Sequence, residues 1–447
     1  MKLLPFYKER LPNGKILITN WLGGWLILNE KEFQDIITKD KEEIDESLLF
    51  LLEEEGFIKV KDIFVKERYK HLAVGTSLHI VSLSKDCNLQ CKYCFMSATK
   101  NKGFLMSKST AEKVVDFIFQ SPSKLIEIHF TGGEPFLNFE VMKFIVERAK
   151  ELNKKKNKKL IFSLTTNLTI LNNEIISFLK ENNFHITVSI DGPKEIHNKF
   201  RAFFDLTYNN IKKLKKEGLN LGFLPVITKE SLKKWKEIID FFVFDLEFYL
   251  VHWKYLYPSG YAKENWDLVG YKAEEFVDSW KKVINYMLKL NEEGIPVKER
   301  WATILLKKIL KKEESNMTCL MNPCGGVSLQ LSYDWDGKIY TCDEGKGIEE
   351  LCLGDVFNDD YKSIRKKPIA IELVSLSSNL DYSCKDCAFN PWCGTCVVEN
   401  LLREKNLFSH VPSSFRHKVL YEQFKFLFRL IDENDLIKNW ALDKVKE

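Results

Sequence analysis

The sequence has little net charge and no long apolar run, and both absences narrow the function of its 447 residues. The 67 Lys and Arg residues nearly balance the 63 Asp and Glu residues, for a net charge of +4, which predicts no nucleic-acid partner. The most apolar stretch, Ile238 to Trp253, is interrupted by Asp240, Asp245 and Glu247, and the first residues contain no apolar signal-peptide core. We therefore expect a cytoplasmic protein without a membrane partner.

Cysteine is absent from most of the chain. All eleven cysteines fall in two groups, three at 87–94 and eight at 319–396. Grouped thiols in a cytoplasmic protein indicate bound metal rather than disulfides.

Hydropathy patterns divide the chain into four parts. Residues 1–72 contain a turn signal at 12–15 between two β-type runs, then two helical segments and the short strand FIKV, which together suggest a winged-helix-like domain. Residues 313–400 are rich in Cys, Gly and turns, as a metal-stapled domain would be, and residues 401–447 form a C-terminal helical segment with an amphipathic helix at 413–432.

Residues 73–312 alternate strands with helices. Six β-type runs separated by helical stretches are predicted at 77–83, 125–130, 160–166, 185–190, 221–227 and 247–253. Such alternation predicts parallel strands with right-handed crossovers, in an open sheet or a partial barrel. The fold class is therefore α/β.

The first predicted strand is followed by a cysteine triplet, Cys87-x3-Cys91-x2-Cys94. Three thiolates leave one iron of a four-iron cluster without a protein ligand, and an open metal position is what a catalytic site needs. A zinc site with three thiolates is the alternative.

Polar motifs follow the next three strands. They are Thr131-Gly132-Gly133-Glu134-Pro135, then Thr165-Thr166-Asn167, then Ser189-Ile190-Asp191-Gly192-Pro193. The glycines allow close approach of a ligand, and the Glu134 carboxylate could pair with an ammonium group. Each motif alone suits a turn or a helix cap, but the carboxyl ends of parallel strands are where active sites are built.

The triplet with Tyr93, the GGEP motif and the SIDGP segment together resemble the radical S-adenosylmethionine (SAM) superfamily. The resemblance implies a partial (β/α)6 TIM-like barrel and a SAM-binding [4Fe–4S] cluster on Cys87, Cys91 and Cys94. It implies SAM contacts from Tyr93 and from Gly132, Gly133, Glu134 and Pro135, with Asn167 and Ser189 as ribose or carboxylate contacts.

The C-terminal cysteines resemble the SPASM domain, which carries two auxiliary [4Fe–4S] clusters. By that resemblance Cys319, Cys324, Cys342 and Cys396 hold one cluster, and Cys384, Cys387 and Cys393 hold the other. The family has a further cysteine downstream, and this chain has none after Cys396. Either the extra Cys352 takes the place of that missing ligand, or the second cluster has an open position or a non-cysteine ligand. Structural zinc sites are the alternative for all the C-terminal cysteines.

Softer matches point to maturases of the His-Xaa-Ser peptide system: the opening PFYKERLPNGKILITNWLGGWLILNEKEF, the lead-in GTSLHIVSL, and His252-Trp253-Lys254-Tyr255 before Pro258-x-Gly260. This resemblance implies oxidation or cross-linking of a residue in a ribosomally made peptide. The peptide would bind through a leader, with residues 1–72 either recognising it at a sheet edge or only packing against the barrel. A flavodoxin or ferredoxin would donate electrons.

Two other functions stay open at this stage. A sulfatase-type protein maturase fits the same motifs, and in such relatives an aspartate in the position of Asp343 is a base; a surface or capping role is its plain alternative. A zinc-stapled, non-enzymatic binding protein is the third hypothesis.

Overall fold

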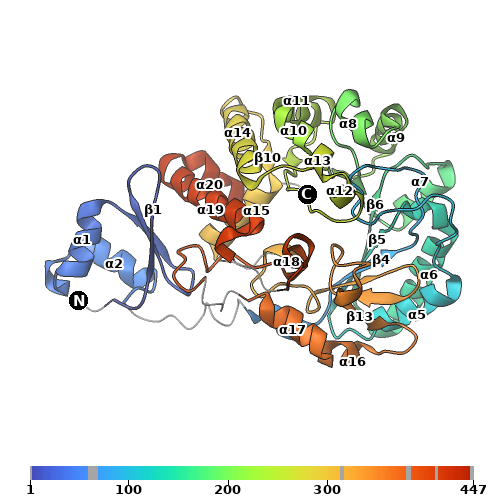
Figure 1. Cartoon of the computed structure of the whole chain (residues 1–447), viewed down its shortest axis with the longest axis horizontal. Coiled ribbons are helices and arrows are strands. Elements are labelled where there is room, and N and C mark those ends of the chain that lie inside the picture. Colours follow the sequence, from blue (N-terminus) through green and yellow to red (C-terminus); the bar gives the residue numbers. More distant parts are fainter. Residues whose placement is uncertain (1–2, 59–68, 313–316, 379–383, 408–410, 443–447) are drawn as a thin grey trace.

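The structure, a computed structural model, describes residues 3–58, 69–312, 317–378, 384–407 and 411–442. Figure 1 shows a blue N-terminal unit at one end, a large α/β part at the other and the red C-terminal helices between them. No helix of the described residues has the length and apolar character needed to cross a membrane.

The N-terminal unit has its own core. Strands β1 (Tyr7–Arg10), β2 (Ile16–Thr19) and β3 (Trp25–Leu28) form an antiparallel sheet in sequence order. Helix α1 (Glu30–Thr38) is capped by Asn29, and α2 (Glu46–Glu54) ends before Gly56, whose φ is +74°. The predicted strand FIKV ends outside the described residues, which stop at 58 before resuming at 69.

The α/β part is built on a large sheet with the strand order β13-β12-β11-β4-β5-β6-β7-β8. Its first five strands in the chain are parallel, and each is separated from the next by one or more helices as the alternation predicts. They are β4 (Leu78–Ser82), β5 (Leu125–Thr131), β6 (Lys159–Thr166), β7 (His185–Val188) and β8 (Leu221–Phe223). The α/β prediction is therefore confirmed.

The sixth predicted strand differs from the simple repeat. Only Leu250–Val251 (β9) is extended there, and it pairs with β10 (Lys298–Glu299) in a separate two-stranded sheet. The other edge of the large sheet is instead extended by the Cys-rich region, because β11 (Gln330–Tyr333) runs parallel to β4. Strands β12 (Lys338–Tyr340) and β13 (Cys352–Asp355) follow it antiparallel.

Helices cover the large sheet and link it to the C-terminal region. The short helix α4 (His71–Val74) precedes β4. Those between and after the parallel strands are α5 (Lys108–Ile118), α6 (Phe139–Lys156), α7 (Asn173–Glu181), α8 (Lys194–Phe200), α9 (Phe204–Lys216), α10 (Lys229–Lys233), α11 (Trp235–Asp240), α12 (Tyr261–Glu264), α13 (Trp266–Val269), α14 (Ala273–Glu292) and α15 (Arg300–Lys311). The later helices are α16 (Tyr361–Lys366), α17 (Pro368–Leu376), α18 (Val397–Glu404), α19 (Phe415–Glu433) and α20 (Asp435–Leu442). The predicted amphipathic helix at 413–432 is α19.

Candidate functional site

The loop after β4 carries the cysteine triplet. Cys87 and Cys91 are buried and Cys94 is half-buried, and the chain turns tightly so that the amide of Cys94 donates to the carbonyl oxygen of Cys91 at 3.1 Å. The amide of Leu89 donates to the Cys87 sulfur at 3.3 Å. Burial raises the pKa of Cys87 to about 12 and of Cys91 to about 11, and neighbouring thiolate charge adds to both shifts. The three thiols are thus gathered in one buried place where metal binding would have to displace their protons.

The glycine-rich motif after β5 lies directly against this loop. A Cβ atom on Gly133 would fall 1.9 Å from the Asp86 carbonyl oxygen, and one on Gly132 would fall 2.2 Å from that of Ser84. The amide of Gly133 donates to the Ser84 oxygen and that of Glu134 to the Asp86 oxygen. Only residues without a side chain allow two backbones to come this close.

The Glu134 side chain faces the protein interior. It is fully buried, and its carboxylate accepts hydrogen bonds from the Phe136 amide, the Asn167 amide and the Thr166 hydroxyl at 2.8–3.1 Å. Burial raises its pKa to about 7, against the opposing effect of these donors. The carboxylate therefore joins the ends of β5 and β6, so the backbone of the motif is left as the part that could meet an ammonium group.

Asn167 completes the link to the triplet. Its side-chain amide donates to Asn88 at 3.0 Å and lies 3.7 Å from the Cys87 sulfur. Ser189 is buried at the end of β7, where its backbone amide donates to the Thr166 carbonyl oxygen. The structure thus brings the polar motifs to the same end of the parallel strands as the cysteine loop.

A buried charged group beside the triplet was missed from the sequence. The Tyr93 hydroxyl hydrogen-bonds to Asp191, and Arg201 donates to Tyr93 at 3.0 Å and to Asp191 at 3.3 Å. The positive charge of Arg201 opposes the rise in the Cys91 pKa, so the guanidinium lies near that thiol. Asp191 could have been chosen from the SIDGP motif, but no sequence signal marks Arg201, which follows α8.

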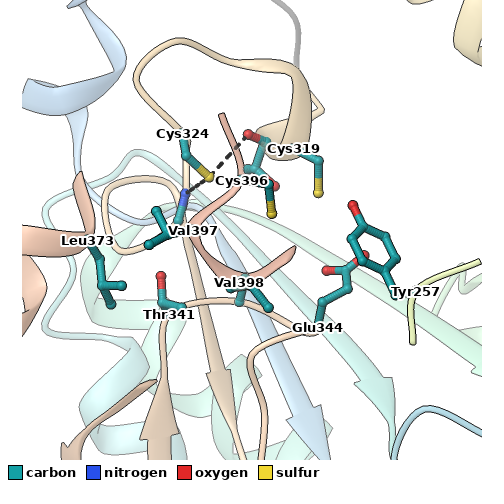
Figure 2. A pocket seen from close by; sticks show the side chains of 12 residues that line it. Tyr257, Cys319, Cys324, Thr341, Glu344, Leu373, Cys396, Val397 and Val398 are labelled. Atoms are coloured by element: carbon teal, nitrogen blue, oxygen red, sulfur yellow. Dashed lines mark hydrogen bonds between the residues drawn. The ribbon is translucent and has the colours of Figure 1, made fainter. Parts of the chain in front are cut away.

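Four cysteines from distant positions line one cavity in the C-terminal region (Figure 2): Cys319, Cys324, Cys342 and Cys396. The Gly326 amide donates to the Cys324 sulfur at 3.3 Å, and the Glu399 amide donates to the Cys396 sulfur at 3.4 Å. Because Cys396 caps the N-terminus of α18, the positive end of that helix dipole favours a thiolate there. Burial raises the pKa of Cys319 to about 12 and of Cys324 to about 11.

The remaining C-terminal cysteines lie apart from this cavity lining. Cys384, Cys387 and Cys393 share one loop with tight turns, in which the Cys387 amide donates to the Cys384 carbonyl oxygen at 3.2 Å. Burial raises the pKa of Cys387 to about 11, and the charges of Cys393 and Glu9 add to the shift. Cys352 begins the edge strand β13, with its sulfur 3.5 Å from the Gly354 carbonyl oxygen.

Asp343 lies beside the inner strands. Lys346, whose side chain is fully buried, pairs with it at 2.8 Å. Burial lowers the pKa of His129 on β5, and the negative charge of Asp343 counters that effect, so the two groups are neighbours.

No three His, Cys, Asp or Glu side chains among the described residues are arranged as ligands of one metal ion.

Comparison with known proteins defines the class. Residues 81–242 match the family model described as the radical SAM superfamily. The chain contains a radical SAM domain and is a radical SAM enzyme, which implies a [4Fe–4S] cluster and SAM as cofactors.

Two curated relatives and one solved structure are more specific. A cysteine-type anaerobic sulfatase-maturating enzyme of Clostridium novyi is 28% identical over 79% of this chain and 94% of its own length. The radical SAM cyclopropyl synthase TigE of Paramaledivibacter caminithermalis is 25% identical over 96% of this chain and 89% of its own length. The structure of native anSMEcpe with bound AdoMet and Cp18Cys peptide matches with a TM-score of 0.69 and 23% identity, over 81% of this chain and 99% of that one.

Proposed function

We propose that this enzyme is a maturase that modifies a side chain of a ribosomally made peptide. The gathering of Cys87, Cys91 and Cys94 beside the GGEP loop and Asn167 carries the proposal. These three thiolates would hold the SAM-binding cluster, which supplies one electron to split bound SAM and so provides a 5′-deoxyadenosyl radical.

The chain's own residues then have distinct tasks around that group. The Gly132–Gly133 backbone and Pro135 would border the methionine end of SAM, while Asn167 and Ser189 offer polar groups to its ribose or carboxylate. Tyr93 would support the cluster loop through its bonds to Asp191 and Arg201. Burial of the whole group excludes water and protects a reactive species.

The C-terminal cysteines would hold two auxiliary clusters. The shared cavity of Cys319, Cys324, Cys342 and Cys396 supports the first assignment, since four thiols on one cavity suit a fully ligated cluster. The loop of Cys384, Cys387 and Cys393 would hold the second, with Cys352 or a non-cysteine group as its fourth ligand.

The choice of a peptide substrate rests on the relatives and on the N-terminal unit. The cyclopropyl synthase relative aligns with 96% of this chain, whereas the Clostridium novyi enzyme leaves about a fifth of it unmatched while using 94% of its own length. Residues 1–72 are a candidate for most of that excess, and an edge of the three-stranded sheet within them could bind an extended leader.

A sulfatase-type maturase is the second candidate. It is favoured by the matches to sulfatase-maturating enzymes. Asp343 would be its candidate base, and the effect of the Asp343 charge on the neighbouring His129 supports that role. Both candidates share the SAM chemistry and differ in substrate.

The first experiment tests the shared chemistry. Protein purified without oxygen should contain iron and sulfide, and on reduction with SAM it should release 5′-deoxyadenosine. Cys91→Ala should abolish that release, and Cys352→Ala, which removes a cysteine outside the triplet, should retain it. Zinc in place of iron, or intact SAM after reduction, would end the proposal.

The second experiment separates the two substrates. The enzyme is offered candidate precursor peptides with and without their leaders, and separately a short peptide containing a single target cysteine or serine, and products are read by mass. Leader-dependent loss of hydrogens from a precursor peptide supports the peptide maturase. Modification of the short peptide alone supports the sulfatase-type enzyme.

A further inference from the structure

Tyr257 is a wall of the cavity lined by Cys319, Cys324, Cys342 and Cys396. It comes from the segment that follows β9, outside the Cys-rich region that supplies the four cysteines. Figure 2 shows its hydroxyl on the side of the ring that faces the sulfur atoms of Cys319 and Cys396. The residue is 7% exposed.

The hydroxyl of Tyr257 has no hydrogen-bond partner among the described residues. Burying a hydroxyl without a hydrogen-bond partner is unfavourable, so such a group normally faces a ligand or an ordered water. The other large polar side chain on the same wall, Glu344, is paired with Lys254 at 2.8 Å. The unsatisfied donor therefore points into the space that four thiols enclose.

Two cations add to the polarity of this wall. The Lys254 ammonium lies 4.9 Å from the centre of the Tyr257 ring, and its positive charge lowers the Cys319 pKa while the negative charge of its partner Glu344 raises it. Arg416 on α19 is buried and donates to the Cys319 carbonyl oxygen at 2.6 Å and to the Gly394 oxygen at 2.8 Å. Positive charge and hydrogen bonds to sulfur both make an iron–sulfur cluster easier to reduce.

We propose that the Tyr257 hydroxyl donates a hydrogen bond to a sulfur atom of the cluster held by Cys319, Cys324, Cys342 and Cys396, and thereby raises its reduction potential. The proposal rests on the proposed function, because it requires an auxiliary cluster in this cavity. Tyr257 is a positioning and tuning residue in this role, since it acts on the cluster and not on the substrate.

The test is a redox titration of full-length, iron-loaded Tyr257→Phe followed by electron paramagnetic resonance. The signal of this cluster is identified as the one that Cys324→Ala loses. We expect normal iron content and a reduction equilibrium constant about tenfold lower, which corresponds to about 59 mV for a one-electron couple. A fluorinated tyrosine at 257, a stronger donor, should shift the potential in the opposite direction.

Tyr271→Phe is the matched control. Tyr271 is also buried, but its hydroxyl accepts from the Leu256 amide at 2.7 Å and does not line the cavity. An unchanged potential in Tyr257→Phe, an equal shift in Tyr271→Phe, or loss of the iron from Tyr257→Phe would overturn the tuning role. If a variant with Cys319, Cys324, Cys342 and Cys396 all changed to alanine contains as much iron as the unmodified protein, the auxiliary cluster itself is absent, and the proposed function fails at that point instead.

Discussion

At the residue scale, the strand ends beside the cysteine triplet depend on polar atoms that bind other protein atoms. Glu134 illustrates this, because its three hydrogen bonds join the loop after β5 to the end of β6. A motif read as ligand-binding from sequence thus has a second task, which is to hold two strand ends at a fixed separation beside the cysteine loop.

Glu134→Ala should lower the free energy of unfolding by about 2–4 kcal/mol, because it leaves buried donors without an acceptor. The loss is measured by thermal unfolding of oxygen-free protein. Glu134→Gln keeps one acceptor oxygen and should lose less. Equal stability of the alanine variant and the unmodified protein would mean that these bonds contribute nothing.

Much of the residue-scale site could be predicted from the sequence. The three thiols and the strand-end motifs were found because spacing and position along the chain reveal them, and the structure places them together. Arg201 and Arg416 could not be predicted, because each reaches its partners across a distance of many residues through folding alone. The orientation of the Glu134 carboxylate was equally hidden, since sequence does not show where a buried side chain points.

At the element scale, the segment before α12 braces the cysteine loop. Gly260 has a φ of +52°, and a Cβ atom there would lie 2.4 Å from the carbonyl oxygens of Cys94 and Phe95. The amide of Tyr261 donates to the Cys94 oxygen at 2.8 Å. The Pro258-x-Gly260 motif therefore fixes the backbone of the last cysteine in the triplet.

Gly260→Ala should reduce iron loading at the triplet, because the backbone strain of about 1–3 kcal/mol is added to a collision with that loop. Gly294→Ala is the control: its φ is +88°, but nothing lies within 4 Å of the added atom. Iron content and SAM cleavage should fall in the first variant and stay normal in the second. Equal effects would assign the loss to backbone strain alone.

The N-terminus of α15 carries a pH-sensitive cap. Glu299 is fully buried and accepts from the amides of Trp253, Trp301 and Ala302, and burial raises its pKa to about 7. In the unfolded chain its pKa is near 4.5. The folded state therefore holds the proton more tightly, so the contribution of this proton to stability is complete below about pH 4.5 and is lost as the pH rises through 7.

Glu299→Gln removes this titration. The melting temperature of the unmodified protein minus that of Glu299→Gln should therefore fall as the pH rises from about 5 to about 7.5. Parallel melting curves over that range, with a constant difference, would show that the carboxyl does not titrate there.

At the scale of the whole molecule, the fold class was predictable and the connections between its parts were not. Alternating strands and helices in 73–312 revealed the parallel sheet, because hydropathy period is local. Strand β11 of the Cys-rich region joins the edge of this sheet beside β4. The two strands are about 250 residues apart in the sequence, and no local pattern specifies such a pairing. The short β9, with its pairing to β10, was hidden for the same reason.

The N-terminal unit is fastened to the C-terminal region. Glu9 on β1 accepts from Tyr421 at 2.7 Å and pairs with Lys425 on α19, and the Thr19 hydroxyl donates to the Ala388 carbonyl oxygen. Trp25 packs edge-on against Phe428, with ring centres 5.5 Å apart. Since Ala388 lies between Cys387 and Cys393, the unit docks against the loop proposed to hold the second auxiliary cluster.

Trp25→Ala should loosen this docking while leaving the unit folded, because Trp25 lies at the start of β3 and packs against Phe428 of α19. We expect a loss of about 2–3 kcal/mol, and faster deuterium exchange in β1–β3 and in residues 384–393 together. Phe50→Ala, at a side chain 62% exposed on α2, should leave both segments unchanged. Faster exchange in β1–β3 alone would mean that the sheet loosens without affecting the cysteine loop, and the two would then be separate structural units.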